Sequence, residues 1–301
     1  MIEHVFPCMG TTIRVLLPDE DTMMVDFVTA RMFYLESIWS RFIPASDISA
    51  IAHANGRSTQ VADETIMLVE QLVNAHIATD GLFDPTIMPA LIAAGYSKSR
   101  VDELASVIAS AEFAGTVSDI KIDTHANEIT VPEGMSLDAG GLGKGLAADI
   151  VTRDLLDMGV QGVSLSVGGD VALVGTPDDG ENWVVNIGAP HNYDEVIATV
   201  RTRGGGVATS TLAARAWEVD GEHRHHVIDP RTRKPVAITP TSTLQATVIA
   251  GSAAWAEAFA TALTVCDPDT AAGFVARHNL AAMILLHDGT TRELGSWASF
   301  Q

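Results

Sequence analysis

The sequence predicts an α+β fold in which mixed or antiparallel sheets pack against helices. Strand-like stretches occur in clusters and do not alternate strictly with helical stretches, which disfavours a doubly wound parallel sheet. Other stretches repeat apolar residues at three- and four-residue steps, the spacing of amphipathic helices. No internal repeat or low-complexity segment interrupts them. With 301 residues the chain can bury a substantial core, and we expect residues 1–301 to form a single domain.

In the first third of the chain, the elements follow from periodicity and from turn residues. From Thr22 to Trp39, apolar residues recur at helical spacing with charged residues between them. Ser46 or Asp47 is placed to cap a short helix, and Gly81 is placed to end another. The expected elements are a strand over 9–17, a helix over 22–39, a short helix after the loop 40–49, and a helix over 63–78.

The remaining elements are expected from the same signals. A turn that contains a proline follows at 82–86, where Pro85 biases Asp84 towards an extended conformation and a fixed direction. Further on, the sequence predicts helices over 101–113, from near Leu146 to about 158, over 253–265 and near the C-terminus. It predicts two short strands within 116–137, strands over 162–167, 170–174, 183–187, 196–201 and 244–250, and a last strand.

Composition and charge exclude several classes of function. Hydrophobic residues make up 47% of the chain, and no apolar run is long enough to span a bilayer, so membrane insertion is not expected. The N-terminus shows no signal peptide or lipid-anchor motif, so we expect a cytoplasmic protein. A formal net charge of −20 argues against binding to nucleic acid. Cys8 and Cys266 are read as reduced thiols.

The stretch from Asp138 to Gly145 reads Asp-Ala-Gly-Gly-Leu-Gly-Lys-Gly and precedes a helix pattern. Glycines let the backbone approach a ligand closely, and a helix N-terminus favours an anion, so a phosphate-bearing ligand is expected here. The stretch is not a standard nucleotide-binding loop, because Asp138 stands where that pattern needs glycine and Gly145 where it needs a hydroxyl. The alternative is a tight connection between a strand and a helix.

Three histidines gather at His223, His225 and His226, just before Asp229-Pro230. On a strand, His223 and His225 share one face and His226 faces the other, so at most two could bind one zinc ion. A second interpretation is that His226 alone is a catalytic imidazole held beside a rigid turn. A third is that all three are surface histidines.

Glu257 and Thr261 are four residues apart in an alanine-rich helical stretch, so both oxygen-bearing side chains lie on one helix face. A carboxylate and a hydroxyl suit a hard cation such as Mg²⁺ or Ca²⁺. The alternative is that Glu257 is a solvated helix position and Thr261 merely fits the core.

The order of these motifs resembles the ApbE family, the FAD:protein FMN transferases, over residues 9 to 265. The motifs that carry the resemblance are Met9-Gly-Thr-Thr, Ser40-Arg-Phe, Ser46-Asp-Ile-Ser, Gly81-Leu-Phe-Asp-Pro-Thr, the Asp138 loop, Gly168-Gly-Asp, Ala208-Thr-Ser, His226-Val-Ile-Asp-Pro-Arg-Thr and Ala256-Glu-Ala-Phe-Ala-Thr. The resemblance implies a two-lobed, T-fold-like architecture with the FAD site between the lobes. It implies a transferase that uses Mg²⁺, or Ca²⁺ or Mn²⁺ in its place, to split FAD.

The family attaches FMN through its phosphate to a threonine hydroxyl of a target flavoprotein and releases AMP. Two alternatives remain: an FAD pyrophosphatase that gives FMN and AMP, and a flavin-binding protein without turnover. The resemblance places FAD contacts at Met9, Phe42, Leu82, Phe83, Asp84, Asp138, Lys144 and Ile228, metal ligands at the Gly141 carbonyl, Glu257 and Thr261, and the chemistry at His226. Because like charges repel, we expect Asp138 to hold the adenine or ribose side of FAD, or to orient its own loop.

The chain departs from the family pattern at three places. Glu257 stands where the family commonly has aspartate, Thr211-Leu212-Ala213 replaces the usual Gly-Asp-Tyr, and Arg233 replaces a glycine that closes a turn. The first departure bears on metal affinity and metal identity. The second bears on the face that meets the acceptor protein.

Overall fold

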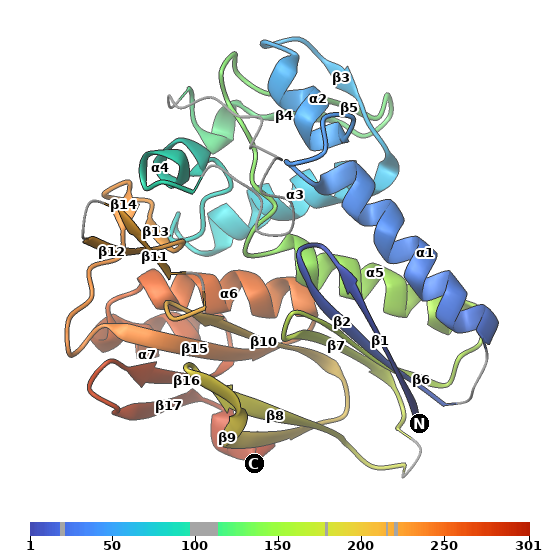
Figure 1. The fold of residues 1–301 in the computed structure, drawn as a ribbon, viewed down its shortest axis with the longest axis vertical. Helices are drawn as coiled ribbons and strands as arrows, with labels where there is room; N and C mark the ends of the chain where they lie inside the picture. The colour runs from blue at the N-terminus through green and yellow to red at the C-terminus, as the bar shows by residue number, and fades with distance from the viewer. Residues whose placement is uncertain (19–21, 97–113, 178–179, 215, 220–221) are drawn as a thin grey trace.

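The computed structural model describes residues 1–18, 22–96, 114–177, 180–214, 216–219 and 222–301 (Figure 1). The helix expected over 101–113 lies outside the described residues. No helix in the described part of the chain combines the length and the apolar character that crossing a membrane requires.

The main sheet has eight strands, and every neighbouring pair is antiparallel. In order across the sheet, the strands are β1 (Ile2–Cys8), β2 (Thr11–Leu17), β6 (Gly162–Val167), β7 (Asp170–Gly175), β10 (Gly205–Thr211), β15 (Thr243–Ala250), β16 (Ala281–Leu286) and β17 (Thr291–Gly295). Consecutive strands are neighbours at both edges, and strands distant in sequence are joined in the middle. This arrangement confirms the predicted α+β class with antiparallel sheet.

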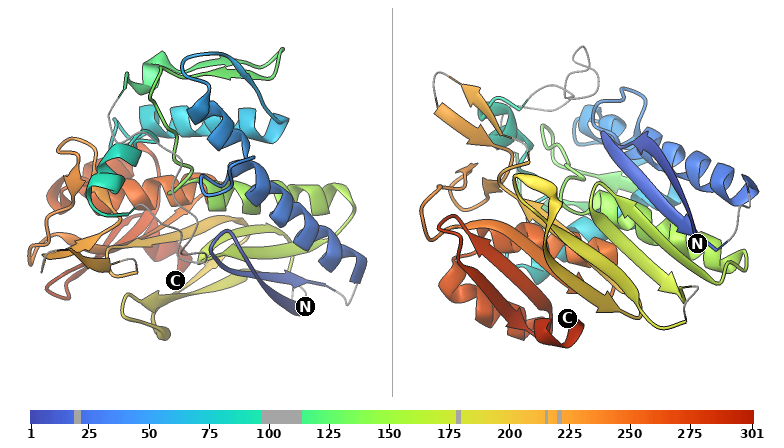
Figure 2. Two further views of the ribbon diagram at one scale, coloured as in Figure 1. Left: turned by 45° about the horizontal axis from the view of Figure 1, so that its top comes forward. Right: turned by 60° about the horizontal axis from the view of Figure 1, so that its bottom comes forward.

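The two faces of this sheet are covered by different elements. Helices α5 (Gly143–Asp157) and α6 (Ala253–Val265) run along one face, with α1 (Thr22–Trp39) beside α5 and α7 (Pro268–Arg277) against β16 and β17 (Figure 1). A hairpin of β8 (Trp183–Ala189) and β9 (Asn192–Thr202), with the short helix η2 (Trp297–Phe300), packs on the other face (Figure 2). Successive side chains of β7 point to opposite faces of the sheet: Ala172 packs on the α5 side, and Val171 and Leu173 pack on the hairpin side.

A second group of elements lies above the helix layer (Figure 1) and forms the upper lobe. It contains α2 (Asp47–His53), α3 (Asp63–Ala78), α4 (Met88–Ala93), the short helix η1 (Val117–Asp119), and a small sheet of β3 (Thr59–Gln60), β5 (Glu128–Thr130) and β4 (Lys121–Asp123). Two further hairpins lie beside α4: β11 (Ala216–Val219) with β12 (Glu222–His225), and β13 (Ile228–Asp229) with β14 (Lys234–Pro235).

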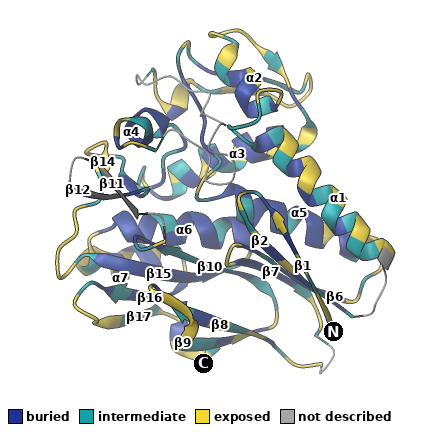
Figure 3. Ribbon diagram, viewed as in Figure 1, coloured by how far each residue is buried: buried dark blue, intermediate teal, exposed yellow. Residues whose placement is uncertain are grey.

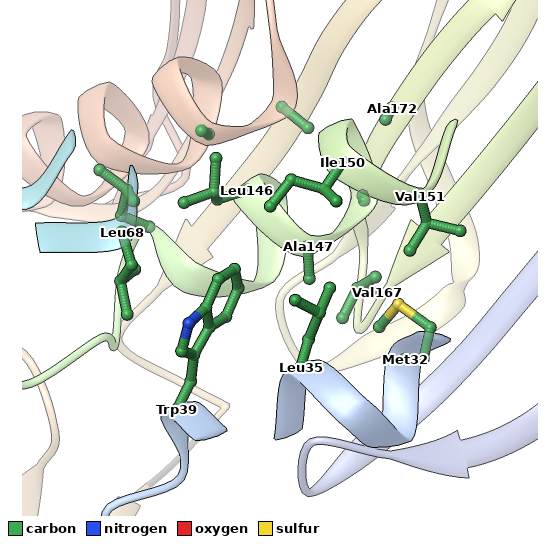
Figure 4. Packing of buried hydrophobic residues seen from close by; sticks show 14 of the residues in the cluster. Met32, Leu35, Trp39, Leu68, Leu146, Ala147, Ile150, Val151, Val167 and Ala172 are labelled. Atoms are coloured by element: carbon green, nitrogen blue, oxygen red, sulfur yellow. The ribbon is translucent and has the colours of Figure 1, made fainter. Parts of the chain in front are cut away.

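The predicted amphipathic helix α1 has the expected buried face. Met32, Leu35 and Trp39 are at most 4% exposed. Figure 4 shows Leu35 below Ala147 and the Trp39 ring directed towards Leu146, while Met32 lies beside Val167. Helices α5 and α6 are buried along most of their length (Figure 3), because the sheet covers one side of them and α1 and α3 cover the other. The core thus fixes the N-terminus of α5, which carries the glycine-rich loop.

Two expectations about element boundaries are wrong. Helix α5 begins at Gly143, not near Leu146, so Lys144 lies in the first helical turn and not in the loop. The chain also has a strand, β1, before Met9, which was not expected because it contains Pro7 and its exposed residues are mixed in type. Proline is tolerated there because β1 is an edge strand that pairs only with β2.

Candidate functional site

A cavity of about 760 Å³ lies where the Asp138 loop and α6 meet residues 82–96 of the upper lobe and the ends of β6, β7 and β10. Its volume is within the range of roughly 300–1,000 Å³ that is usual for small-molecule sites. All of the predicted site residues except Met9 and Phe42 line it: Leu82, Phe83, Asp84, Asp138, Gly141, Lys144, His226, Ile228, Glu257 and Thr261.

The two predicted residues outside the lining belong to segments that reach the cavity. Met9 occupies the turn between β1 and β2 with a positive φ of 53° and packs against the main core, while Thr11 and Thr12, which follow it, do line the cavity. The Phe42 ring lies 5.0 Å from the guanidinium of Arg41, which lines the cavity. Both segments therefore reach the cavity through neighbouring residues.

Asp138 organises the loop that carries its name. Its backbone N–H donates to the Pro85 carbonyl at 2.8 Å, and its carboxylate accepts the Gly140 N–H at 2.9 Å and pairs with Arg41. The side chain is almost fully buried by these contacts. Of the two roles expected for Asp138, these contacts support orientation of the loop.

Asp84 is held in the single direction that its place before Pro85 predicts. Its carboxylate accepts hydrogen bonds from the Thr86 N–H at 2.8 Å and from the Thr86 hydroxyl at 2.7 Å. The carboxylate therefore presents a fixed edge to the cavity.

Gly141 and Thr261 meet at the centre of the cavity wall. Gly141 has a φ of +82°, and a Cβ atom there would lie 2.9 Å from the Thr261 hydroxyl oxygen, so only glycine fits. The same hydroxyl lies 3.2 Å from the Ser210 hydroxyl on β10. Helix α6 and the sheet therefore contribute hydroxyl oxygens to one small region, and the loop packs against it.

Three charged side chains form a cluster beneath this region. The Lys144 ammonium pairs with Asp170 and lies 2.5 Å from Glu257 Oε1, while Glu257 Oε2 accepts the Gly145 N–H at 2.8 Å. Glu257 is 2% exposed, so its interpretation as a solvated helix position is wrong. Burial, reinforced by the charge of Glu257 and opposed by that of Lys144, raises the pKa of Asp170, because one ammonium is shared between two carboxylates.

Helices α5 and α6 each provide a carboxylate that caps the N-terminus of the other. Asp149 of α5 accepts the backbone N–H groups of Ala253 and Ala254 at 2.9 and 2.8 Å, just as Glu257 of α6 accepts that of Gly145. These bonds satisfy donors that a helix leaves free at its start. This pair of capping interactions fixes Glu257 relative to the Asp138 loop. Burial raises the pKa of Asp149 to about 6.

This raised pKa predicts a pH effect on stability. Folded Asp149 keeps its proton up to about pH 6, whereas an unfolded aspartate loses it near pH 3.9, so the Asp149 contribution to folding is largest below about pH 4 and declines as pH rises to about 6. Replacing Asp149 by asparagine removes this titration. The denaturant midpoint of wild type should therefore fall relative to that of Asp149→Asn as the pH rises from 4 to 7. A difference that is constant across this range would contradict the prediction.

The two described histidine side chains of the cluster have different environments. His225 is 3% exposed, its Nε2 lies 3.0 Å from the Val236 carbonyl, and its Nδ1 accepts the Val227 N–H at 3.3 Å. Since one ring nitrogen donates and the other accepts, His225 is neutral, and burial lowers its pKa. The surface interpretation is therefore wrong for His225, and these bonds leave it no nitrogen for zinc. His226 is half-buried and lines the cavity.

The oxygen-rich region is not a cluster of conventional ligand side chains. Within the described residues, no three His, Cys, Asp or Glu side chains are grouped so as to hold a metal ion. A cation site there would have to draw on the Thr261 hydroxyl and on backbone oxygen as well as on the Glu257 carboxylate.

Sequence reasoning missed Arg41 and Asp170 as site residues, although both stand inside motifs that it used. Arg41 neutralises Asp138 and lies over the rings of Phe42 and Tyr96, at 5.0 and 5.5 Å. Asp170 begins β7 and pairs with Lys144. The available signal was a charged residue within an otherwise apolar or glycine-rich motif, which predicts a buried partner of opposite charge.

Of the three departures from the family pattern, the one at Arg233 is accommodated locally. Arg233 takes the left-handed conformation, with a φ of 57°, in the turn between β13 and β14. Its N–H donates to the Asp229 carbonyl at 2.7 Å, which closes the turn. The turn next to His226 is therefore kept without glycine.

Comparison with known proteins gives consistent results. The profile of the ApbE family matches residues 9–284. A FAD:protein FMN transferase of Klebsiella pneumoniae is 27% identical over 244 residues, which cover 78% of this chain and 69% of the relative. A FAD:protein FMN transferase of Escherichia coli K12 is 33% identical over 166 residues, which cover 55% of this chain and 46% of the relative.

Solved structures confirm the predicted architecture. The ApbE protein of Thermotoga maritima has a TM-score of 0.86 at 24% identity, and the alignment covers 99% of this chain and 98% of that one. The apo flavinyl transferase ApbE of Pseudomonas stutzeri has a TM-score of 0.81 at 23% identity, over 99% and 96% of the two chains. Since the family profile spans most of its length, the chain belongs to the ApbE family.

Proposed function

We propose that this protein is a FAD:protein FMN transferase that moves FMN from FAD to a threonine hydroxyl of a target flavoprotein and releases AMP, in a reaction that depends on Mg²⁺. The observation that carries the proposal is that one cavity brings together the Asp138 loop, the Glu257–Thr261 face of α6 and His226. Relatives with this name match most of the chain. Because both lobes line the cavity, we also propose that residues 1–301 act as one domain.

The residues present fit a hard divalent cation. Glu257 supplies a carboxylate and Thr261 a hydroxyl on one helix face, and Gly141, which packs against Thr261, would add its carbonyl oxygen. Mg²⁺ prefers such oxygen ligands, and the cluster beneath them carries one more negative than positive charge. When bound, the cation would neutralise charge on the pyrophosphate of FAD.

The proposed FAD contacts divide by chemistry. Leu82, Phe83 and Ile228 are apolar and suit a ring system, whereas Met9 and Phe42 adjoin residues that line the cavity. The positive end of α5 and the Lys144 ammonium favour the phosphates. Asp138 and Asp84 keep their loops in place through the hydrogen bonds described above.

In the proposed reaction, the threonine oxygen bonds to the phosphorus of the FMN half as the bond from that phosphorus to the AMP oxygen breaks. The threonine proton passes to His226, and AMP leaves with the bridging oxygen. Phosphoryl transfer depends mainly on position and charge neutralisation, so the imidazole has only a proton to accept. A general base of this kind typically contributes about 10²–10⁴-fold to the rate.

A single incubation tests the proposal against its rivals. Purified protein is mixed with FAD, Mg²⁺ and an acceptor flavoprotein, and the products are separated on a denaturing gel and by chromatography. Flavin fluorescence that stays with the denatured acceptor, together with AMP, supports transfer. Free FMN with AMP would show hydrolysis instead, and unchanged FAD would show a binding protein without turnover.

The metal assignment predicts a specific defect in Glu257→Gln. Glutamine keeps the shape of the side chain but removes the charge that attracts the cation, so the Mg²⁺ concentration that gives half-maximal activity should rise at least about tenfold. Glu70→Gln, an exposed change on α3, serves as the control. An unchanged metal requirement in Glu257→Gln would remove Glu257 from the site.

A further inference from the structure

The charge cluster in the cavity contains one ammonium group and two carboxylates. Asp170 and Glu257 each have 3% of their side-chain surface exposed, whereas Lys144 has 24%. When both carboxylates are ionised, the cluster therefore carries one uncompensated negative charge in a place where solvent reaches mainly the lysine. A buried charge without a partner is unfavourable, so the cluster favours a second cation.

The two carboxylates are held by different parts of the fold. Asp170 begins β7 directly after the Gly168-Gly169 turn, where a Cβ on Gly168 would lie 2.5 Å from the Thr11 hydroxyl. The sheet therefore fixes Asp170. Glu257 comes from α6 and keeps a second bond, from the Gly145 N–H at 2.8 Å. Its carboxylate therefore stays aimed at the same place if Lys144 withdraws.

Oxygen atoms lie on both sides of Glu257, because the Asp170 carboxylate interacts with it from the sheet and the Thr261 hydroxyl shares its helix face. Thr261 lies one turn further along the same face of α6, and Gly141 lies against Thr261. Asp170 lies on the sheet side and pairs with Lys144. A divalent cation on the Thr261 side would therefore compete with Lys144 for Glu257, while Asp170 keeps its pairing with the Lys144 ammonium.

We propose that Lys144 is an exchangeable counter-ion: its ammonium holds Glu257 when no divalent cation is bound, and Asp170 retains it when the cation takes Glu257. The inference rests on the proposed metal site. It assigns Asp170 the role of a positioning residue that acts through Lys144 and does not contact the cation.

The test measures cation binding in the absence of FAD, by isothermal titration of wild type and variants with MnCl₂ or MgCl₂. Lys144→Met removes the competing ammonium, so the dissociation constant of the metal ion should fall at least about tenfold. This change is smaller than the full interaction between two charges in contact. Asp170→Asn leaves Lys144 with Glu257 alone, so the dissociation constant should rise at least about tenfold.

The double variant Lys144→Met/Asp170→Asn separates this inference from direct ligation. With no ammonium to retain, loss of Asp170 should matter little, and the double variant should bind the cation at least as tightly as wild type. If Asp170 were itself a ligand, the double variant would bind weakly, which would overturn the inference. Weaker binding by Lys144→Met alone would overturn it as well.

Two controls remove a positive charge elsewhere. Arg14 lines the cavity but pairs with Glu3, and Lys121 is exposed on β4. Arg14→Met and Lys121→Met should change the dissociation constant of the metal ion less than about threefold, since neither of these side chains contacts Glu257. Thermal unfolding confirms that each variant is folded, and the Mn²⁺-induced rise in its midpoint gives a second measure of binding. Because no flavin is present, the result does not depend on whether the protein transfers FMN.

Discussion

Replacing His226 by alanine is expected to lower the turnover number at least about a hundredfold, because the threonine proton then has no positioned acceptor. The dissociation constant of FAD should change little, since His226 is one of many residues in the cavity wall and the loop, the apolar wall and Lys144 remain. Turnover is measured by flavin fluorescence on the acceptor, and FAD binding by equilibrium titration. A variant that retained the full rate would show that the imidazole is not the base.

A further measurement distinguishes a base from a residue that only shapes the cavity. Added imidazole should restore part of the rate of His226→Ala. His225→Ala is the matched control, because His225 is buried and bonded to Val236 but is not part of the cavity wall. That variant should lose stability, and imidazole should not rescue it.

The parts of the fold that the sequence predicted best are helices with strong local signals. Helices α1, α3 and α6 have the predicted ends, because each combines an apolar stripe with clear start or stop residues. Strand β10 was not expected, since it begins in a run of glycines that reads as a loop. A Cβ on Gly206 would collide with the backbone of Ser252 and Ala253, so the missing side chain is what allows β10 to lie under α6. Such a contact between distant segments has no local signature.

In the site, too, local motifs were predicted and contacts between distant segments were not. Gly141, Glu257, Thr261 and His226 were identified through motifs, and the structure brings them to one cavity. The pairing of Lys144 with Asp170 and Glu257 was not predicted, because the three residues come from a helix, a strand and another helix far apart in the sequence. The resemblance placed Lys144 among the FAD contacts, and the sequence placed it in a loop. Its place in the first turn of α5 and its two carboxylate partners give it a second task that only the fold reveals.

Gly145→Ala is expected to destabilise the protein by about 2–3 kcal/mol, although alanine is ordinarily the better helix former. Gly145 lies in the first turn of α5, where a Cβ would be 2.5 Å from the Ala253 carbonyl carbon and 2.7 Å from the Ala254 nitrogen. These atoms belong to the backbone of α6, which cannot move without giving up its bonds to Asp149. The two helices must therefore separate, and Glu257 moves with α6.

The same substitution at Gly273 should have the opposite sign. Gly273 lies within α7, is exposed, and has nothing within 4 Å of the position that a Cβ would take. Gly273→Ala should therefore stabilise the protein by about 0.5–1 kcal/mol through helix propensity alone. Denaturant unfolding of the two variants beside wild type measures both effects. Equal shifts would mean that the approach of α5 to α6 does not limit stability, and a weaker Mn²⁺ affinity in folded Gly145→Ala would show that this approach also sets the position of Glu257.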